Sequence, residues 1–194
     1  MIAIYIAAGV VSFLLIALAV SYDRFVRQRN LIRNSWSNVE TELRRRYDLI
    51  PNLVNAVKGY AAHERELFEK VADARAAAIG QTGQPADLAR TENALVTGVR
   101  GLLAVAENYP QLKASENFLA LQNELTGTED RIQAARRFYN NNVRAFNTRV
   151  QSFPSNMIAG MFKFQAEQYF EIEQAIASAG APAVDLAPEP GTAS

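Results

Sequence analysis

Apolar residues recur every three or four positions along most of the chain, which is the spacing of helices that pack side by side. In the first such stripe, one seven-residue gap over Glu64 interrupts the regular steps. Its members are Trp36, Val39, Leu43, Tyr47, Ile50, Val54, Val57, Ala61, Phe68 and Val71. We therefore expect one long helix over residues 33–78. No segment shows the alternation of a strand, so the sequence predicts an all-α fold.

Two further stripes predict a second helix over about residues 87–109 and a third over residues 115–152. The stretch GQTGQPAD is typical of a loop, and Pro110 and Pro154 should end the second and third helices. At about 1.5 Å per residue, the second helix and its connector return the chain far enough to begin a long third helix. These three helices predict an elongated antiparallel bundle with an up-down-up course.

A shorter fourth helix is expected from about Gln165 to Ala177, folded back over the end of the bundle. If the third helix runs away from the N-terminal segment, this end is the distal one. The final residues, 179–194, are rich in proline, alanine and small polar side chains, which predicts a disordered tail.

Pro51 lies in the middle of the first expected helix, where a proline normally breaks or kinks the chain. The apolar stripe keeps its phase across Pro51, so the helix axis is expected to continue. Asp48 could act as an N-cap and place the proline in a first turn, whose N–H groups have no helical partner. We therefore interpret Asp48 and Pro51 as a helix joint within a nearly continuous rod.

The N-terminal segment MIAIYIAAGVVSFLLIALAVSY carries no charged side chain. About 20 apolar residues span the roughly 30 Å hydrocarbon core of a bilayer, so residues 1–22 are predicted to be a transmembrane anchor. A cleaved signal peptide is an alternative, because Ala17, Leu18 and Ala19 resemble a cleavage site. However, no Lys or Arg precedes the run, and the run is longer than in most signal peptides. A buried core helix is the other alternative.

The charges beside this segment predict its orientation. Only the α-amine precedes it, whereas four arginines follow it closely: Arg24, Arg27, Arg29 and Arg33. The positive-inside tendency then places the N-terminus outside and residues 23–178, the helical bundle, in the cytoplasm.

The sequence contains no pattern typical of a catalytic, metal-binding or cofactor-binding site. It has no cysteine, and its single histidine, His63, lacks a second histidine at metal-ligand spacing. The stretch GQTGQP lacks the ending of a phosphate-binding loop, and paired carboxylates such as Glu40 and Glu42 diverge around a helix. The net charge of zero favours no nucleic acid. We expect no small-molecule substrate, cofactor or nucleic-acid partner.

Arg44, Arg45 and Arg46 form a short cationic patch. One interpretation is a solvated helix face on which these arginines pair with Glu40 and Glu42 across helical turns. The other is a contact for an acidic partner or for lipid headgroups.

Two polar residues, Thr128 and Asn142, occupy positions of the third apolar stripe. A buried asparagine can fix the register of packed helices at some cost in stability. We therefore expect a structural role for this pair.

A compact apolar cluster follows the third helix in the stretch MIAGMFKF. Its members are Met157, Ile158, Met161, Phe162 and Phe164. The cluster could pack onto the end of the bundle. Alternatively, it could form a surface for a protein partner or for a second copy of the chain.

Three stretches together resemble the LemA family: LRRRYDLIPNLVNAVKGYAAHE, ENALVTGVRGLLAVAENYPQLKASENFLALQNELTGTEDRI and RRFYNNNVRAFNTRVQSFPSNMIAGMFKF. The resemblance covers about residues 25–172. It implies a single-pass protein of the bacterial inner membrane, with an external N-terminus and a helical cytoplasmic domain. It supplies no catalytic residues to transfer.

These observations favour a non-enzymatic scaffold or adaptor anchored in the membrane, which could also assemble with copies of itself. A second hypothesis is a regulator or sensor subunit of a membrane protease or envelope-maintenance system. A third is an enzyme whose site the sequence does not reveal.

Overall fold

The structure, a computed structural model, describes residues 1–81 and 84–172. Every regular element in these ranges is a helix, which confirms the all-α prediction. The elements are α1 (Ile2–Lys58), α2 (Arg65–Gly80), α3 (Pro85–Glu107), α4 (Pro110–Lys113), α5 (Glu116–Gln151) and α6 (Ser155–Met161). The expected tail, and residues 173–177 of the expected fourth helix, lie outside the described residues.

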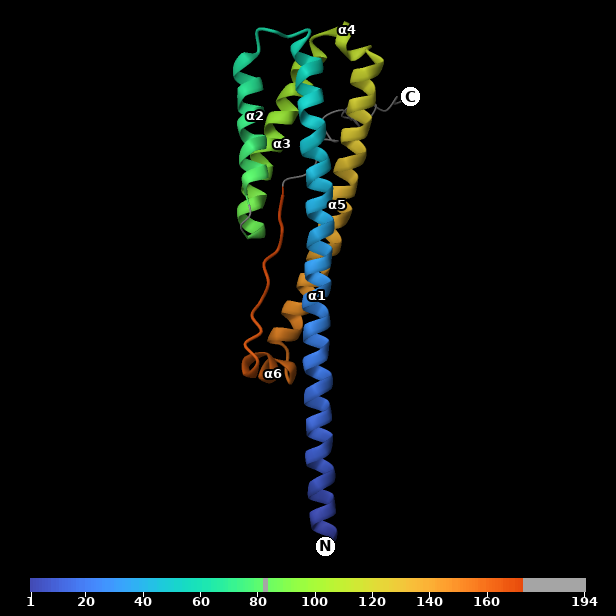
Figure 1. Cartoon of the computed structure of the whole chain (residues 1–194), viewed down its shortest axis with the longest axis vertical. Helices are drawn as coiled ribbons and strands as arrows, with labels where there is room; N and C mark the ends of the chain where they lie inside the picture. Colours follow the sequence, from blue (N-terminus) through green and yellow to red (C-terminus); the bar gives the residue numbers. More distant parts are fainter. Residues whose placement is uncertain (82–83, 173–194) are drawn as a thin grey trace, which may run out of the picture.

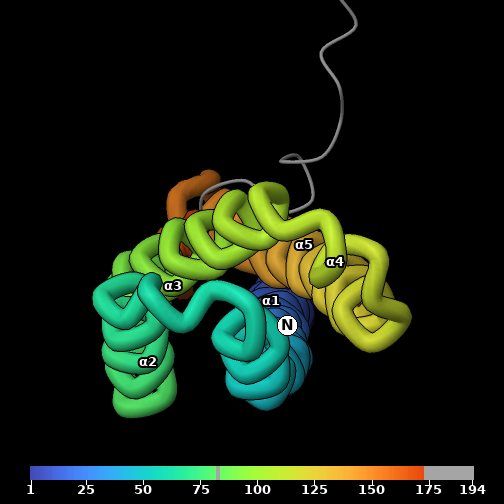
Figure 2. The backbone as a smooth tube through the Cα atoms, turned by 90° about the horizontal axis from the view of Figure 1, so that it is seen from above, coloured from blue at the N-terminus to red at the C-terminus, as the bar shows by residue number. Residues whose placement is uncertain are grey.

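The long helices form an antiparallel bundle around the C-terminal part of α1. From the end of α1 the chain descends through α2, rises through α3 and descends again through α5 (Figure 1). Seen from above, α1 lies between α5 and the α2–α3 pair (Figure 2). α1 packs most extensively against α5, and α2 packs against α3. The N-terminal residues of α1 project from one end of the bundle.

The single helix expected over residues 33–78 is wrong. α1 ends at Lys58, the chain reverses through residues 59–64, and α2 begins at Arg65. The reversal falls in the gap between Ala61 and Phe68, which are both buried. The chain therefore changes direction once more than expected. As a result, α5 runs toward the N-terminal end of α1 rather than away from it.

α1 continues through Pro51 without interruption. Proline has no N–H, so the carbonyl four residues earlier, that of Tyr47, lacks its helical donor. Arg75 of α2 supplies a replacement, because its Nε donates to Tyr47 O over 2.7 Å. The expected N-cap at Asp48 is wrong, since Asp48 is an exposed residue inside the helix. The hydrogen bond that the helix loses becomes a contact between two helices.

The core consists of aliphatic and aromatic side chains that the stripes turn toward one another. Leu43 and Ile50 of α1 are at most 2% exposed, and burying such a side chain contributes about 1.5–3 kcal/mol. Gly98 of α3 allows α2 to approach closely, because a Cβ at that position would lie 2.9 Å from Val71 Cγ2. A larger residue at position 98 would therefore push the two helices apart.

Residues 164–172, which we call the strap, are extended rather than helical. The fourth helix expected from Gln165 is therefore wrong over its described part, and the helix that follows α5 is α6 instead. The strap rises from α6 alongside α5 (Figure 1). At its middle, the Gln168 side chain donates a hydrogen bond to Gln84, which immediately precedes α3.

Candidate functional site

Arg46 is completely buried, although its neighbours Arg44 and Arg45 are exposed. The expected solvent-facing cationic patch is therefore wrong for Arg46. Arg45 lies 3.7 Å from Glu42, one turn earlier on the outer face of α1. Arg46 instead contacts acidic side chains of α3 and α5 inside the bundle.

Arg46, Glu92 and Glu129 form a charge cluster that joins α1, α3 and α5. Arg46 Nη2 lies 3.3 Å from Glu92 Oε2, and Arg46 Nε lies 3.2 Å from Glu129 Oε1. None of the three side chains is more than 1% exposed. These contacts are ion pairs by distance, but the Arg46 nitrogens are not aligned for hydrogen bonds. The Tyr47 hydroxyl donates a hydrogen bond to Glu92 Oε1.

Burial raises the pKa of both carboxyls in the charge cluster. For Glu92 and Glu129, the loss of water outweighs the attraction of Arg46, which acts in the opposite direction. Burial also raises the pKa of the Tyr47 hydroxyl, and the negative charge of Glu92 raises it further. Enclosing charges in this way is costly, and it leaves each of them dependent on its partners. The cluster is thus a structural link between three helices.

Sequence reasoning missed Glu92 and Glu129, although the stripe spacing contains a signal for Glu92. Leu88 and Leu95 are seven residues apart, and Glu92 occupies the stripe position between them. Arg46 is also one turn from Leu43 and from Ile50, although Tyr47 holds the stripe position between those two residues. A charged residue that has apolar residues one helical turn before it and one turn after it faces the same side of the helix as they do. Such a residue indicates a buried charge when a neighbouring helix places the opposite charge at the same height along the bundle.

α5 binds the strap through its main chain. Asn147 Nδ2 donates to Glu167 O over 2.9 Å, and Asn147 Oδ1 accepts from Glu167 N over 2.8 Å. One heptad earlier, Asn140 makes the same pair of hydrogen bonds with Phe170, at 3.0 and 2.9 Å. Each side-chain amide therefore satisfies one donor and one acceptor, as a neighbouring β-strand would.

Aromatic packing seats the strap as well. The Phe170 ring is fully buried and meets Trp36 of α1 edge-on, with 5.2 Å between the ring centroids. The Tyr139 hydroxyl donates to Gln168 O over 2.8 Å, and burial raises the pKa of Tyr139 to about 12. The strap thus packs against both α1 and α5.

The two polar stripe residues differ in their surroundings. Thr128 is buried, and its hydroxyl accepts a hydrogen bond from Arg131 Nη2 over 2.9 Å. Asn142 is half-buried, and its Nδ2 makes no hydrogen bond within the described part of the chain. The asparagines that bind the strap are instead Asn140 and Asn147, and neither occupies a position of the predicted apolar stripe.

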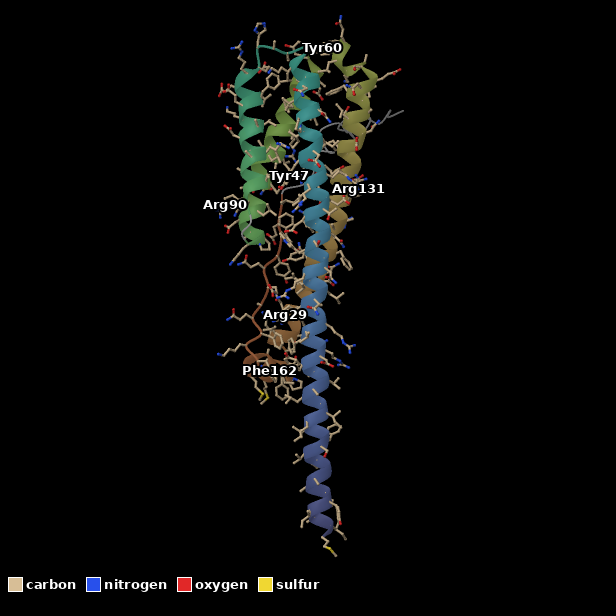
Figure 3. All side chains as sticks on the ribbon, viewed as in Figure 1. Arg29, Tyr47, Tyr60, Arg90, Arg131 and Phe162 are labelled. Carbon is tan, nitrogen blue, oxygen red and sulfur yellow. The ribbon has the colours of Figure 1, made fainter. Side chains whose placement is uncertain are left out.

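The apolar cluster after α5, which we call the α6 cluster, lies at the end of the bundle from which the N-terminal part of α1 projects, and not at the expected distal end. It retains the five residues singled out in the sequence: Met157, Ile158, Met161, Phe162 and Phe164. Figure 3 shows that Phe162 lies nearer than Arg29 to the N-terminal end of α1. The direction of α5 explains the error, since α6 follows directly from its lower end.

The α6 cluster is divided between packing and surface. Phe164 belongs to the core and stacks on Phe25, with 4.8 Å between ring centroids. Phe162 approaches Tyr22 with a centroid distance of 4.7 Å. Two of its members remain largely exposed, Met157 at 66% and Met161 at 67%.

A groove of about 830 Å³ separates α6 from the N-terminal part of α1. Two arginines contribute to its lining, Arg24 of α1 and Arg149 of α5. Its apolar walls come from both helices: Leu14, Leu15, Leu18, Met157, Ile158 and Met161. The groove is therefore open, mostly apolar and cationic in part.

α1 contains one stretch that is long and apolar enough to cross a membrane, judged by length and composition. None of that stretch is buried in the molecule. Within the described fold it is therefore not a core helix, which removes one alternative for residues 1–22.

His63 is exposed in the turn between α1 and α2, and not on a helix. Among residues 1–81 and 84–172, no group of three His, Asp or Glu side chains could hold a metal ion. The charge cluster has two carboxylates, and both face Arg46.

The chain is similar in sequence to several known proteins. The chain is 25% identical to magnetosome protein MamQ 2 of Paramagnetospirillum magneticum, over 84% of this chain and 69% of the relative. It is 28% identical to protein LemA of Metamycoplasma hominis, over 71% of this chain and 63% of the relative. The LemA family profile matches residues 35–186, which is most of the bundle. The chain belongs to the LemA family.

Proposed function

We propose that the chain is a membrane-anchored, non-enzymatic helical scaffold or adaptor at the inner face of the bacterial membrane. The continuity of α1 is the observation that carries this proposal. One helix joins the exposed apolar residues 2–22 to the centre of the bundle. A continuous helix fixes the height and direction of the bundle relative to the anchor. Such a rigid stand suits a protein that presents a surface to other proteins.

The flanking charges support the orientation of this proposal. Arg24, Arg27, Arg29 and Arg33 follow the apolar segment, and positive charge favours the cytoplasmic side. The bundle would then stand in the cytoplasm, with the N-terminus outside and one crossing of the inner membrane.

The burial of the charge cluster supports a non-enzymatic role. Burial raises the pKa of Glu92 and of Glu129, and Arg46 lies against both carboxylates, an arrangement also found in active sites. Their side chains are nevertheless closed to solvent, so a substrate would have no access to them. Thermal stabilisation of the purified protein by a metal or nucleotide would argue for an enzyme instead.

Single-cysteine labelling tests the anchor and its orientation, because the chain has no cysteine of its own. Ala62→Cys places a thiol in the exposed turn at the distal end of the bundle. We expect the protein in the membrane fraction, with no labelling by an impermeant maleimide until the inner membrane is permeabilised. Labelling in cells whose inner membrane is intact would contradict the cytoplasmic placement.

Photo-crosslinking in cells tests the scaffold role. Phe138 on α5 is 53% exposed and Leu119 is 42% exposed, so crosslinkers at these positions do not disturb the core. Adducts with a second copy would identify self-assembly, and a recurrent second protein would identify an adaptor. A recurrent membrane protease would favour the regulator hypothesis. Only monomers, at both positions and at native abundance, would contradict the scaffold.

A further inference from the structure

We propose that the groove between α6 and α1 is a phospholipid site. One acyl chain would lie against Met157 and Met161, and the phosphate would meet Arg24 and Arg149. This inference rests on the proposed anchoring of residues 2–22. It assigns the exposed part of the α6 cluster to the bilayer rather than to a protein partner.

The depth of the groove follows from its α1 wall. That wall extends from Leu14 to Arg24, and Leu14 lies about 12 Å along the helix axis from Tyr22. The hydrocarbon of one leaflet is about 15 Å thick, so a groove along this wall lies within one leaflet. The groove is therefore continuous with the surface that the anchor exposes to lipid.

Exposed apolar side chains around α6 match that depth. Phe153 is 80% exposed, and Met157 and Met161 are about two-thirds exposed. In water these side chains would form an unfavourable apolar patch, whereas acyl chains cover them favourably. Met157 and Met161 line the groove whose other wall is the apolar segment of α1, and Phe153 directly precedes Pro154, which also lines it.

Three polar groups at the two ends of α6 are paired within the protein, which suits a segment that contacts hydrocarbon. The Ser155 hydroxyl donates to Arg149 O over 2.7 Å. At the other end of α6, Phe162 N donates to Ile158 O over 3.0 Å and Phe164 N donates to Ala159 O over 2.9 Å. α6 can therefore contact hydrocarbon without leaving these backbone groups unpaired.

Charge selects the headgroup. Arg24 lies two residues after the apolar segment of α1, beyond Asp23, and lines the groove, whereas Asp23 is not part of the lining. Arg149 lines the same groove from α5. The Arg149 guanidinium lies 5.9 Å from the centre of the Phe25 ring, which orients it. A guanidinium pairs well with phosphate oxygens, and two of them favour an anionic phospholipid.

Spin labels on full-length single-cysteine variants measure the depth of α6 directly. The variants Met157→Cys and Met161→Cys would be reconstituted in vesicles of phosphatidylcholine and phosphatidylglycerol. Val11→Cys reports on the anchor, and Ala62→Cys reports on water. We expect the labels at 157 and 161 to be accessible to oxygen and shielded from a nickel chelate, as at 11, with the reverse at 62.

The reference positions separate failure of the inference from failure of the proposed function. A label at Val11 that is open to nickel would overturn the anchor itself. Labels at 157 and 161 open to nickel, with 11 shielded, would overturn only the lipid site. Labels at 157 and 161 closed to both oxygen and nickel would show a protein covering the groove, and would also overturn it.

Lipid retention tests the headgroup contact. Phosphatidylglycerol that remains bound to the full chain on release from mixed-lipid nanodiscs would be counted by mass spectrometry. We expect Arg24→Gln and Arg149→Gln each to lower the bound fraction about fivefold. The exposed pair Arg44→Gln and Arg137→Gln is the matched control. Unchanged retention in the Arg24/Arg149 double variant, with native helicity by circular dichroism, would overturn the site.

Discussion

Neighbouring arginines of α1 have opposite environments, and this contrast is visible only at the scale of single residues. Arg46 sits between two buried carboxylates, while Arg45 faces water. Because Arg46 is buried, its removal would leave two buried carboxylates without a positive charge. Because Arg45 is exposed, its ion pair contributes little to stability.

We predict that Arg46→Met lowers the free energy of unfolding by about 3–5 kcal/mol, because it leaves two buried carboxylates without a counter-charge. Arg45→Met, one residue away on the exposed face, should lower it by less than about 1 kcal/mol. Urea denaturation of the detergent-solubilised full chain, followed by circular dichroism, measures both. Equal losses in the two variants would contradict the charge cluster.

The raised pKa values of the two carboxyls predict how stability depends on pH. Because burial raises the pKa of Glu92 and Glu129 above the ordinary 4.5, the unfolded chain releases these protons first as pH rises. Their contribution to stability is therefore complete below about pH 4.5 and is lost as pH rises through the folded-state values.

Glu129→Gln should accordingly flatten the fall in unfolding free energy above pH 4.5. Glu66→Gln is the matched control: Glu66 is exposed, and Lys70, 2.7 Å away, lowers the pKa of its carboxyl. A pH profile that Glu129→Gln leaves as steep as in the natural protein would refute the assignment.

The apolar residues of the core follow from the stripes, whereas the fate of individual charges does not. Stripe positions such as Leu43 and Ile50 are buried as expected. Arg46 is one of three consecutive arginines, and its local sequence fits the surface equally well. Its burial depends on Glu92 and Glu129 reaching the same level from two other helices, which local spacing does not encode.

The joint between α1 and α2 illustrates how one element compensates for a defect in another. Pro51 frees the Tyr47 carbonyl, and Arg75 binds it from α2. Pro51→Ala would restore the helical donor, so the helix would no longer need the arginine.

We therefore predict that Arg75→Ala costs about 1.5 kcal/mol or more in the natural chain, and about 1 kcal/mol less in a Pro51→Ala background. A double-mutant cycle from denaturation curves gives this coupling. Both variants should keep the helical fold. Additive costs within about 0.5 kcal/mol would show that Arg75 does not replace the missing donor.

The strap depends on side-chain amides of α5 for its extended form. Asn147→Ala removes both hydrogen bonds to Glu167, at a cost of about 1–3 kcal/mol. We predict that hydrogen exchange at the strap amides accelerates by about tenfold or more. Asn141→Ala, on the exposed face of α5, should leave the exchange unchanged. Equal protection in the two variants would rule out the bidentate contact.

Helices were predictable as elements, but the strap was not. The run from Gln165 to Ile172 has a helix-forming composition, and that local preference predicts a helix. Two of its backbone segments instead form hydrogen bonds with the side chains of Asn140 and Asn147. These asparagines lie 30 and 20 residues earlier in the chain than the strap residues that they bind. Tertiary contacts of this kind override local propensity.

The course of the whole molecule turns on the six residues between α1 and α2. The stripe spacing correctly predicts an elongated antiparallel bundle. A seven-residue gap, however, is equally compatible with a continuous helix and with a reversal. The reversal sends α5 back along α1, and this places α6 beside the apolar segment instead of at the far end. The candidate partner surface thereby becomes a candidate lipid surface.

The asparagine contacts to the strap also have a consequence for how the sequence can drift over evolutionary time. Because Asn140 and Asn147 bind backbone atoms, most residue types could replace the outward-facing Gln165 and Ala166 without loss of the contact. Selection should therefore retain asparagine at 140 and 147 while the outer face of the strap changes freely. An alignment of relatives in which these two positions vary as much as the exposed Asn141 would show that the strap is peculiar to this chain.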